Sequence, residues 1–333
     1  MSHLQKAFPE SRIITYSSSH SLTFLPNLSK LNLEYPRMGW AISREFARLN
    51  KEEEFDLVIC NDLAGLGLNV LEPQIPAMQV FHYTYRGFAE SALRGLPGYV
   101  PSKHFLPWFE KATAHGKRIV AVSHKTRREL ESLYGRSATV IENAVPLDVF
   151  HPLPQDECRA ELGIKWKGPI GIFVGRADPS KGFDVVRQIA KSRKDIKILC
   201  VTGSRVEKED REKMIVFQKV PNEEMPKYYS SADFLLFPSR YESSSYITIE
   251  ALACDLPVVA YRTGVFEDMD NDKVGVIVER VDYETFMRAI DQILSMERVK
   301  TRACAEKRFS MERFIAEYRK LAREMLEKNV MTE

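Results

Sequence analysis

Short apolar runs alternate with amphipathic segments along most of the chain, and this alternation restricts the fold more than any other feature. The runs 77–81, 170–174 and 234–237 have the length and the composition of buried strands, whereas 183–190 and 283–295 show the spacing of amphipathic helices. Strands that alternate with helices form parallel sheets covered on both faces. The sequence therefore predicts an α/β protein built from doubly wound, Rossmann-like sheets.

The chain is long enough for two domains. A single hydrophobic core rarely accommodates a chain of 333 residues. The segment His151-Pro152-Leu153-Pro154 interrupts the alternation, which restarts afterwards. We expect an N-terminal domain over 1–150, a C-terminal domain over 151–310, and a helix over 311–333 that packs back on the first domain. The two domains are expected to face each other across a cleft.

Composition excludes several classes of protein. The net charge of +2 favours no particular partner, and we expect no nucleic-acid partner because the chain lacks a motif for one. The five cysteines are scattered, without a Cys-x-x-Cys pair. Reduced, buried thiols are typical of a cytoplasmic protein. No apolar run is long enough to span a bilayer. We expect a cytoplasmic protein that is attached to a membrane at most peripherally.

The stretch 238–260 is the first candidate for a ligand site. An apolar run enters it at 234–237 and another leaves it at 258–260, with a polar loop and a short helix between them. Parallel sheets bind ligands at the carboxyl ends of their strands, where this loop lies. It carries Glu242 in the loop and Glu250 in the helix, which Ser244 or Ser245 is expected to cap. These residues indicate a pocket for a polar ligand.

A second loop carries cations. Gly175-Arg176 and Lys181-Gly182 follow the predicted strand 170–174, and Gly203 follows the strand 196–201. Such cations suit an anionic ligand, and the start of the helix near Tyr246 offers free backbone N–H groups to a phosphate. Glu250 could accept two hydrogen bonds from a vicinal diol such as ribose. A nucleotide diphosphate with an attached group fits this arrangement.

An ordered set of motifs resembles a known family. Glu242 and Glu250, separated by seven residues and followed by Ala-Leu-Ala-x-x-Leu-Pro-Val-Val-Ala, look like the signature of family-4 retaining glycosyltransferases of the GT-B fold (glycosyl transferases group 1). Further matches are Phe-Val-Gly-Arg176 with Lys181-Gly182, Met-Pro-x-Tyr-Tyr-x-Ser-Ala-Asp233, and Ile-Glu-Asn143-Ala-Val-Pro. The resemblance covers the chain from about residue 55 to its C-terminus.

The resemblance implies a hexosyltransferase that moves a sugar from a UDP-, GDP- or ADP-sugar to a glycan, lipid-linked or small-molecule acceptor. It implies catalytic roles for Arg176 and Lys181 at the diphosphate, Glu242 at the donor sugar and His82 between donor and acceptor. Neither a metal nor another cofactor is expected. The remaining implied positions are Gly175, Gly203, Lys219, Val220, Ser245, Tyr246, Ile247 and Glu250 for the donor, and Asn143 and Arg86 on the acceptor side.

The chain departs from the family at three places. Ser243-Ser244-Ser245-Tyr246 replaces an aromatic residue and a glycine, and Asp255 stands where a glycine is common. The chain also opens with a helix near residues 4–8, where the family has a first strand and a glycine-rich loop. We expect either that the start of the protein lies upstream or that this strand is missing. These departures leave two alternatives: a non-catalytic partner subunit that binds a nucleotide sugar, or a sugar-nucleotide epimerase of the same two-domain shape.

Two weaker motifs point elsewhere. Gly65-x-Gly67 lacks the third glycine of a dinucleotide fingerprint, because Val70 occupies that position. Asp268, Asp270 and Asp272 have the spacing of a calcium loop, but Lys273 replaces the central glycine. We expect neither site.

The segment 86–128 is rich in Lys, Arg and aromatic residues and contains few acids. Basic residues among aromatic ones suit the anionic headgroups of a membrane surface. A solvated face beside a buried aromatic core would give the same composition. The segment therefore predicts peripheral membrane contact as one of two interpretations.

Overall fold

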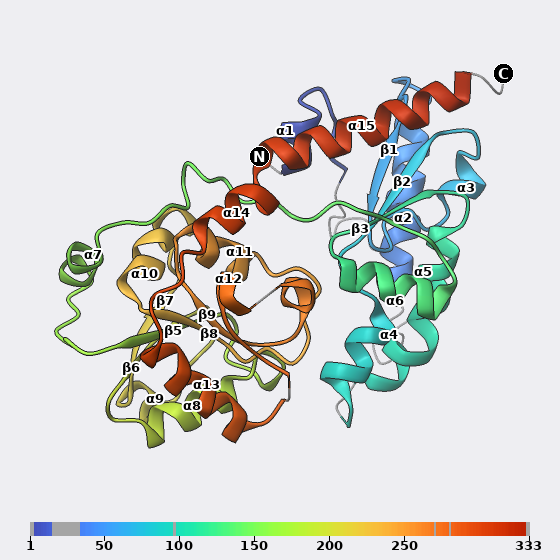
Figure 1. Ribbon diagram of the computed structural model, residues 1–333. Helices are drawn as coiled ribbons and strands as arrows, with labels where there is room; N and C mark the ends of the chain where they lie inside the picture. The colour runs from blue at the N-terminus through green and yellow to red at the C-terminus, as the bar shows by residue number, and fades with distance from the viewer. Residues whose placement is uncertain (1–2, 15–33, 96–97, 270, 280, 331–333) are drawn as a thin grey trace. The chain divides into compact units, whose positions relative to one another are not determined.

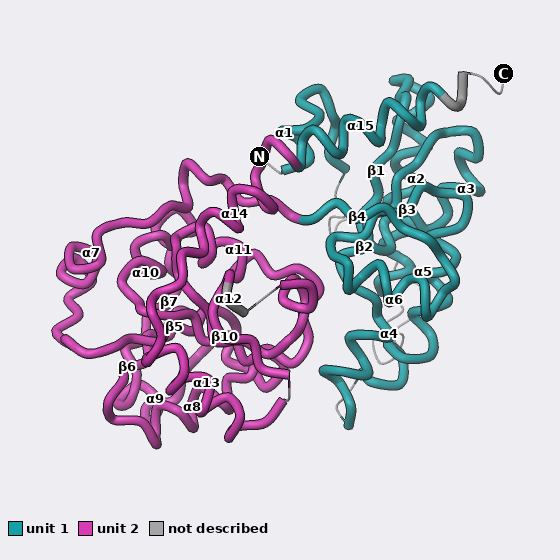
Figure 2. Tube along the Cα trace, in the orientation of Figure 1, with its two compact units in different colours: residues 1–142, 314–333 teal, residues 143–313 magenta. Residues whose placement is uncertain are grey.

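The computed structural model describes residues 3–14, 34–95, 98–269, 271–279 and 281–330. The chain forms two compact units, one from Met1–Glu142 with Phe314–Glu333, and one from Asn143–Arg313 (Figure 2). The sequence placed these boundaries at 150 and 310. Unit 1 is therefore assembled from both ends of the chain, whereas unit 2 is continuous in sequence.

Unit 1 contains a parallel sheet. Within its described residues, the strands β1 (Val58–Asn61), β2 (Ala77–Phe81), β3 (Arg118–Ala121) and β4 (Thr139–Val140) lie in the order of the sequence. Strand β2 is buried along its whole length, as expected for a central parallel strand. Residues 11–14 have no regular structure.

The helices of unit 1 come from both ends of the chain (Figure 1). In α15, Phe314, Tyr318 and Leu321 are buried on the apolar face that the sequence predicts, and the Arg319 Nε–H donates to the Ala7 carbonyl at 2.8 Å. The helices are α1 (His3–Ala7), α2 (Glu34–Leu49), α3 (Leu68–Leu71), α4 (Tyr85–Phe88), α5 (Leu106–Ala114), α6 (His124–Tyr134) and α15 (Met311–Val330), with π turns η3 (Ala89–Leu93) and η4 (Pro101–Phe105).

Unit 2 contains a six-stranded parallel sheet, with strand order β10-β9-β8-β5-β6-β7. If the strands are numbered from β5 in chain order, they lie in the order 6-5-4-1-2-3, which is the order of a doubly wound sheet. The direction of winding reverses between the first and the fourth of these strands, β5 and β8. The strands are β5 (Ile170–Val174), β6 (Lys197–Thr202), β7 (Met214–Gln218), β8 (Phe234–Phe237), β9 (Val258–Tyr261) and β10 (Gly275–Val278).

Helices cover both faces of this sheet. Successive residues of β8 alternate between two hydrophobic clusters: Leu235 and Phe237 belong to one, Phe234 and Leu236 to the other. Helices α10 and α11 contribute to the first cluster, and α8 and α13 to the second. The helices are α7 (Gln155–Glu161), α8 (Phe183–Ser192), α9 (Lys208–Arg211), α10 (Met225–Ser231), α11 (Tyr246–Ala253), α12 (Asn271–Val274), α13 (Tyr283–Ser295) and α14 (Arg302–Phe309), with 3-10 turns η5 (Pro179–Lys181), η6 (Asn222–Glu224) and η7 (Gly264–Asp268).

Two segments of unit 2 that lead to its boundaries pair with each other. The Val145 N–H donates to the Phe309 carbonyl at 2.9 Å, and Val145 and Ser310 form an isolated parallel bridge. The Arg313 guanidinium also donates to the Asn143 carbonyl. The points at which the chain leaves and re-enters unit 1 are thus held together.

Candidate active site

The point where the winding of the sheet in unit 2 reverses brings two loops together. One loop follows β5 and carries Gly175, Arg176 and Lys181; the other follows β8 and carries Glu242. Because β5 and β8 are neighbouring parallel strands, both loops leave the same edge of the sheet. Doubly wound sheets bind their ligands at this point.

A tight backbone contact fixes the two loops against each other. Gly182 has a φ of +71°, and a Cβ atom there would lie 2.1 Å from the carbonyl oxygen of Pro238. Only glycine fits this position, because any side chain would displace the backbone of the other loop. The Arg240 N–H also donates to the Ser180 carbonyl at 3.0 Å, and the Arg240 guanidinium binds both carboxylate oxygens of Asp184.

Lys181 and Glu242 form an ion pair across the two loops. The Lys181 Nζ lies 2.5 Å from Glu242 Oε1, and the Ser239 hydroxyl donates to the same oxygen at 2.7 Å. The Glu242 N–H donates to the Thr263 hydroxyl, which holds the backbone of the loop. The two side chains keep 25% and 12% of their exposure, so both reach the surface of the site. The pair places one cation and one carboxylate at the edge of the sheet.

Arg176 supplies a second cation. Its Nε lies 3.0 Å from Asp178 Oδ2, yet 68% of the side chain is exposed, so the guanidinium can reach a ligand. Gly175, beside it, adopts a φ of +141°, a conformation that side chains disfavour. The exposed Gly203 follows β6, and the next residue, Ser204, accepts a hydrogen bond from the Ala177 N–H at 3.1 Å. The loops after β5 and β6 are therefore joined.

Lys219 and Val220 follow β7 at the same edge of the sheet. Lys219 has a φ of +56°, which is uncommon for a residue with a side chain. Val220 packs against the cluster that contains the apolar side of α11. Two strands, β5 and β6, separate this position from β8.

The helix α11 begins directly after the loop that follows β8. Ser245 occupies its N-cap position, but its side chain makes no capping hydrogen bond. The prediction that Ser244 or Ser245 caps the helix through its side chain is therefore wrong, because Ser244 Oγ instead binds Asn143 Nδ2 at 3.2 Å. The half-exposed Tyr246 and the partly buried Ile247 follow in the first turn.

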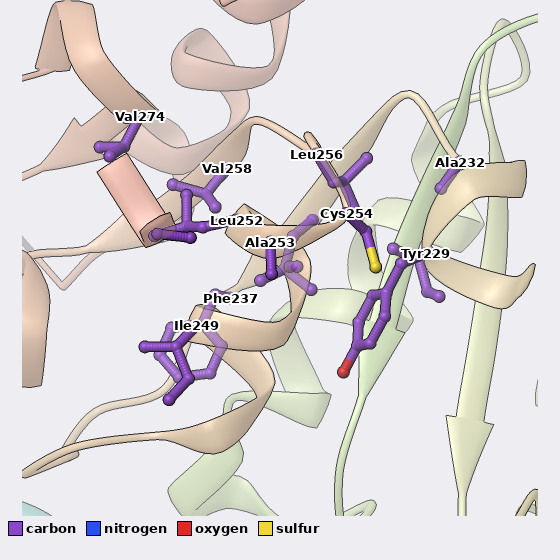
Figure 3. Packing of buried hydrophobic residues seen from close by; sticks show 14 of the residues in the cluster. Tyr229, Ala232, Phe237, Ile249, Leu252, Ala253, Cys254, Leu256, Val258 and Val274 are labelled. Carbon is purple, nitrogen blue, oxygen red and sulfur yellow. The ribbon is translucent and has the colours of Figure 1, made fainter. Parts of the chain in front are cut away.

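Glu250 lies one turn further along α11 and is almost fully buried. Its Oε2 accepts a hydrogen bond from the hydroxyl of Tyr229, on α10, at 2.8 Å. Burial raises the pKa of Glu250 to about 7, and the Tyr229 hydrogen bond opposes that rise. Figure 3 shows the Tyr229 ring beside Cys254, in the cluster that packs α10 and α11 together. Sequence reasoning missed this partner, although Tyr229 lies in a family motif.

Asp255 explains one departure from the family pattern. It has a φ of +59°, the left-handed conformation that a glycine adopts without strain. Its Oδ1 accepts hydrogen bonds from the N–H groups of Thr301 and Arg302 at 2.7 and 3.1 Å. The aspartate thus connects the end of α11 to the start of α14, which a glycine could not do.

Unit 1 holds the predicted His82 at the carboxyl end of β2. Its N–H donates to Asp62 Oδ1 at 3.0 Å, and its Nε2 lies 3.0 Å from Asn61 Oδ1. Burial raises the pKa of Asp62, while the nearby His82 lowers it. Arg86 is exposed and pairs with Glu90 at 3.3 Å. Both predicted residues of unit 1 thus lie at or just beyond the end of the same strand.

Neither a spanning helix nor a metal cluster stands out in the described ranges. Over these residues, no helix combines the length and the apolar character needed to cross a bilayer. The same residues contain no group of three or more His, Cys, Asp or Glu side chains placed to hold a metal ion. Asp270 of the predicted calcium spacing lies outside them.

Two family models match the chain, one on each side of the predicted linker. "Glycosyltransferase Family 4" matches residues 3–149, and "Glycosyl transferases group 1" matches residues 154–309. The chain belongs to the family-4 glycosyltransferases of the GT-B fold. The resemblance predicted from the motifs around Glu242 and Glu250 is confirmed.

Relatives in this glycosyltransferase family are similar over about half of the chain. A D-inositol 3-phosphate glycosyltransferase of Mycobacterium sp. (strain JLS) is 28% identical over 54% of this chain and 45% of the relative. The putative teichuronic acid biosynthesis glycosyltransferase TuaC of Bacillus subtilis (strain 168) is 28% identical over 49% of this chain and 43% of the relative. The match thus spans less than half of the length of either relative.

Solved structures confirm the expected GT-B fold. Sucrose-phosphate synthase from Thermosynechococcus elongatus superposes with a TM-score of 0.77 at 20% identity, covering 96% of this chain and 87% of that chain. HepE from Anabaena, in complex with UDP-glucose, superposes with a TM-score of 0.64 at 16% identity, covering 83% of this chain and 81% of that chain.

Proposed function

We propose that this protein transfers a sugar from a nucleotide-diphospho-sugar to an acceptor hydroxyl, with retention of configuration and without a metal. The ion pair between Lys181 and Glu242 carries this proposal, because it places the two charges that such a donor needs where the winding of the sheet reverses. The UDP-glucose complex of the structurally similar HepE supports a nucleotide sugar as the donor.

The positive groups of the site would stabilise the leaving diphosphate. Arg176 and Lys181 contribute two cations, and the first turn of α11 contributes backbone N–H groups. Negative charge develops on the diphosphate as its bond to the sugar breaks, so donors that are already in place lower the barrier. Glu242 balances the charge of Lys181, and a bound diphosphate would share that cation.

The two glutamates would recognise different parts of the donor. Glu242 would accept hydrogen bonds from the hydroxyls of the sugar, and Glu250 from the ribose diol. The Glu242 Oε1 already accepts hydrogen bonds from Lys181 and Ser239. A carboxylate held in this way suits hydrogen bonding to the sugar better than nucleophilic attack. We therefore propose that the acceptor hydroxyl attacks from the face that the nucleotide leaves and that the departing phosphate takes its proton.

The remaining positions would serve the base and the acceptor. Gly203, Lys219 and Val220, at the ends of β6 and β7, would line the base and ribose side of the donor site. His82, Arg86 and Asn143 would act on the acceptor side. The acceptor class stays open among glycans, lipid-linked carriers and small molecules. Five free thiols support a cytoplasmic site of action.

Donor binding and transfer test this proposal together. The thermal midpoint is measured with UDP-glucose, GDP-mannose and ADP-glucose, because a ligand that binds only the folded state raises it. Nucleotide release is then measured with and without a set of sugar phosphates and extracted lipids. We expect Lys181→Ala, Arg176→Ala and Glu242→Ala each to lower turnover by at least about 100-fold. Lys167→Ala, at an exposed lysine of the same unit, serves as the matched control.

The outcome separates the alternatives. Release of nucleotide only in the presence of an acceptor supports transfer. Stabilisation by a nucleotide sugar without any turnover supports the non-catalytic partner subunit, and interconversion of the sugar without acceptor supports the epimerase. Unchanged turnover in all three variants would exclude this site.

A further inference from the structure

An exposed apolar stripe runs along one helical segment of unit 1. Residues 99–114 are helical, first through the π turn η4 and then through α5. Val100, Phe105 and Trp108 keep 56%, 49% and 80% of their exposure. A π turn advances five residues, as the hydrogen bond from the Leu106 N–H to the Pro101 carbonyl shows, so Val100 and Phe105 share one side. Trp108 follows three residues later on the same side.

The opposite side of this segment forms the contact with the rest of unit 1. Ser102, Leu106, Glu110 and Thr113 are all at most 3% exposed. The Glu110 carboxylate accepts hydrogen bonds from the Tyr85 N–H and from the Tyr134 hydroxyl. One side of the segment therefore packs against the rest of unit 1, and the apolar stripe on its other side lies outside the core.

The charges around the stripe are almost all positive. Between residues 86 and 118 the chain has six Lys and Arg side chains, and its only acids are Glu90 and Glu110. Because Glu110 points into the core, Glu90 is the one acid of this range at the surface. Lys103 lies beside the Tyr99 ring and hydroxyl, while Arg94 and Lys111 are exposed. Apolar side chains and cations thus share one face.

We propose that this face, defined by Val100, Phe105, Trp108, Arg94 and Lys111, docks on a bilayer that contains anionic lipids. Tryptophan and phenylalanine side chains enter the boundary between headgroups and acyl chains, and Lys and Arg contact the phosphates on their flexible stems. Three apolar side chains on a single helical ridge are fewer than a stable protein partner needs, since such interfaces bury at least about 1,000 Å². A bilayer requires no such matching surface.

Co-sedimentation of the full chain with lipid vesicles tests the docking face. We expect binding to vesicles of phosphatidylcholine and phosphatidylglycerol at low salt, loss of that binding at about 0.5 M salt, and little binding to phosphatidylcholine alone. Phe105→Ser with Trp108→Ser should weaken binding at least about tenfold. Val70→Ser, at a 73% exposed position in α3 of the same unit, is the matched control.

A charge variant tests the second half of the proposal. Lys111→Glu should weaken binding at least about fivefold at low salt, because one cation near the surface is removed and an acid takes its place. The exposed Lys51→Glu is its control and should bind as the unmodified chain does. All four variants change only exposed side chains, so the thermal midpoint should stay unchanged and confirm that the variants fold.

Three results would overturn the proposal. The first is equal binding by the Phe105→Ser, Trp108→Ser variant and the Val70→Ser control. The second is equal binding to neutral and anionic vesicles. The third is a dimer in solution that the Phe105→Ser, Trp108→Ser variant converts to a monomer. The last result would assign the face to a second copy of the chain. The test uses no sugar donor, so it is independent of the proposed transfer reaction.

Discussion

The buried carboxyl group of Glu110 predicts how the stability of unit 1 depends on pH. Burial raises the pKa of Glu110 to about 8, and the hydrogen bonds from the Tyr134 hydroxyl and the Tyr85 N–H oppose that rise. The folded chain then holds a proton, from about pH 4.5 to about pH 8, that the unfolded chain has released. Stability must therefore fall as the pH rises through this range.

The magnitude follows from the same two pKa values. Within this range one bound proton changes the free energy of unfolding by about 1.4 kcal/mol per pH unit. Between pH 6 and pH 9 the loss amounts to roughly 2–3 kcal/mol, because the effect ends near the folded-state pKa. Glu110→Gln keeps the size of the side chain and removes its titration. The free energy of unfolding of this variant, relative to that of the unmodified chain, should therefore increase by roughly 2–3 kcal/mol between pH 6 and pH 9.

Urea unfolding, followed by tryptophan fluorescence at pH 6, 7, 8 and 9, measures this difference. Trp40 and Trp108 report on unit 1, and Trp166→Phe in every protein removes the tryptophan of unit 2. Taking the difference between variant and parent cancels the other titrating groups. Glu90→Gln, at an exposed pair with Arg86, is the control and should give a constant difference. Parallel curves for Glu110→Gln would refute the reasoning.

Three further predictions concern unit 2. Gly182→Ala should lower the free energy of unfolding, measured by urea titration, by about 2 kcal/mol or more. The reason is that the new Cβ would collide with the Pro238 carbonyl and that residue 182 has a positive φ. A loss below about 0.5 kcal/mol would contradict this prediction. Asp255→Ala should cost about 1–2 kcal/mol through the lost hydrogen bonds to the start of α14, whereas an effect within error would show that these bonds contribute nothing. Tyr229→Phe removes the hydrogen bond that lowers the pKa of Glu250. The pH midpoint for binding UDP-glucose should therefore move upward. An unchanged pH profile would exclude a link between Tyr229 and Glu250.

Much of unit 2 could be predicted because its strands are buried on both faces. Strands β5, β6, β8 and β9 appear in the sequence as apolar runs, and each of them lies where its run predicted. The order of the loops then brings Lys181 near Glu242, although 61 residues separate them in the chain. Sequence reasoning expected these loops to meet at one edge of the sheet, because parallel strands share their carboxyl ends.

Features that depend on a single tertiary contact were missed. The π turn η4 has no periodicity that distinguishes it from a loop, and the exposed Trp108, in α5, resembles a core residue in the sequence. Tyr229 looks like any apolar helix residue until α10 packs on α11 and its hydroxyl meets Glu250. Ser245 carries a capping side chain at the right position, yet its side chain makes no capping bond in the folded loop.

The discontinuous make-up of unit 1 sets the order in which the chain can mature during synthesis. Unit 2 is complete once Arg313 has been made, but unit 1 still lacks the part of α15 that begins at Phe314. The buried positions of α15, including Phe314 and Tyr318, would leave apolar surface on unit 1 until the last turns of that helix emerge. Domains tend to fold as units while the ribosome works, so the second domain of this chain should fold before the first.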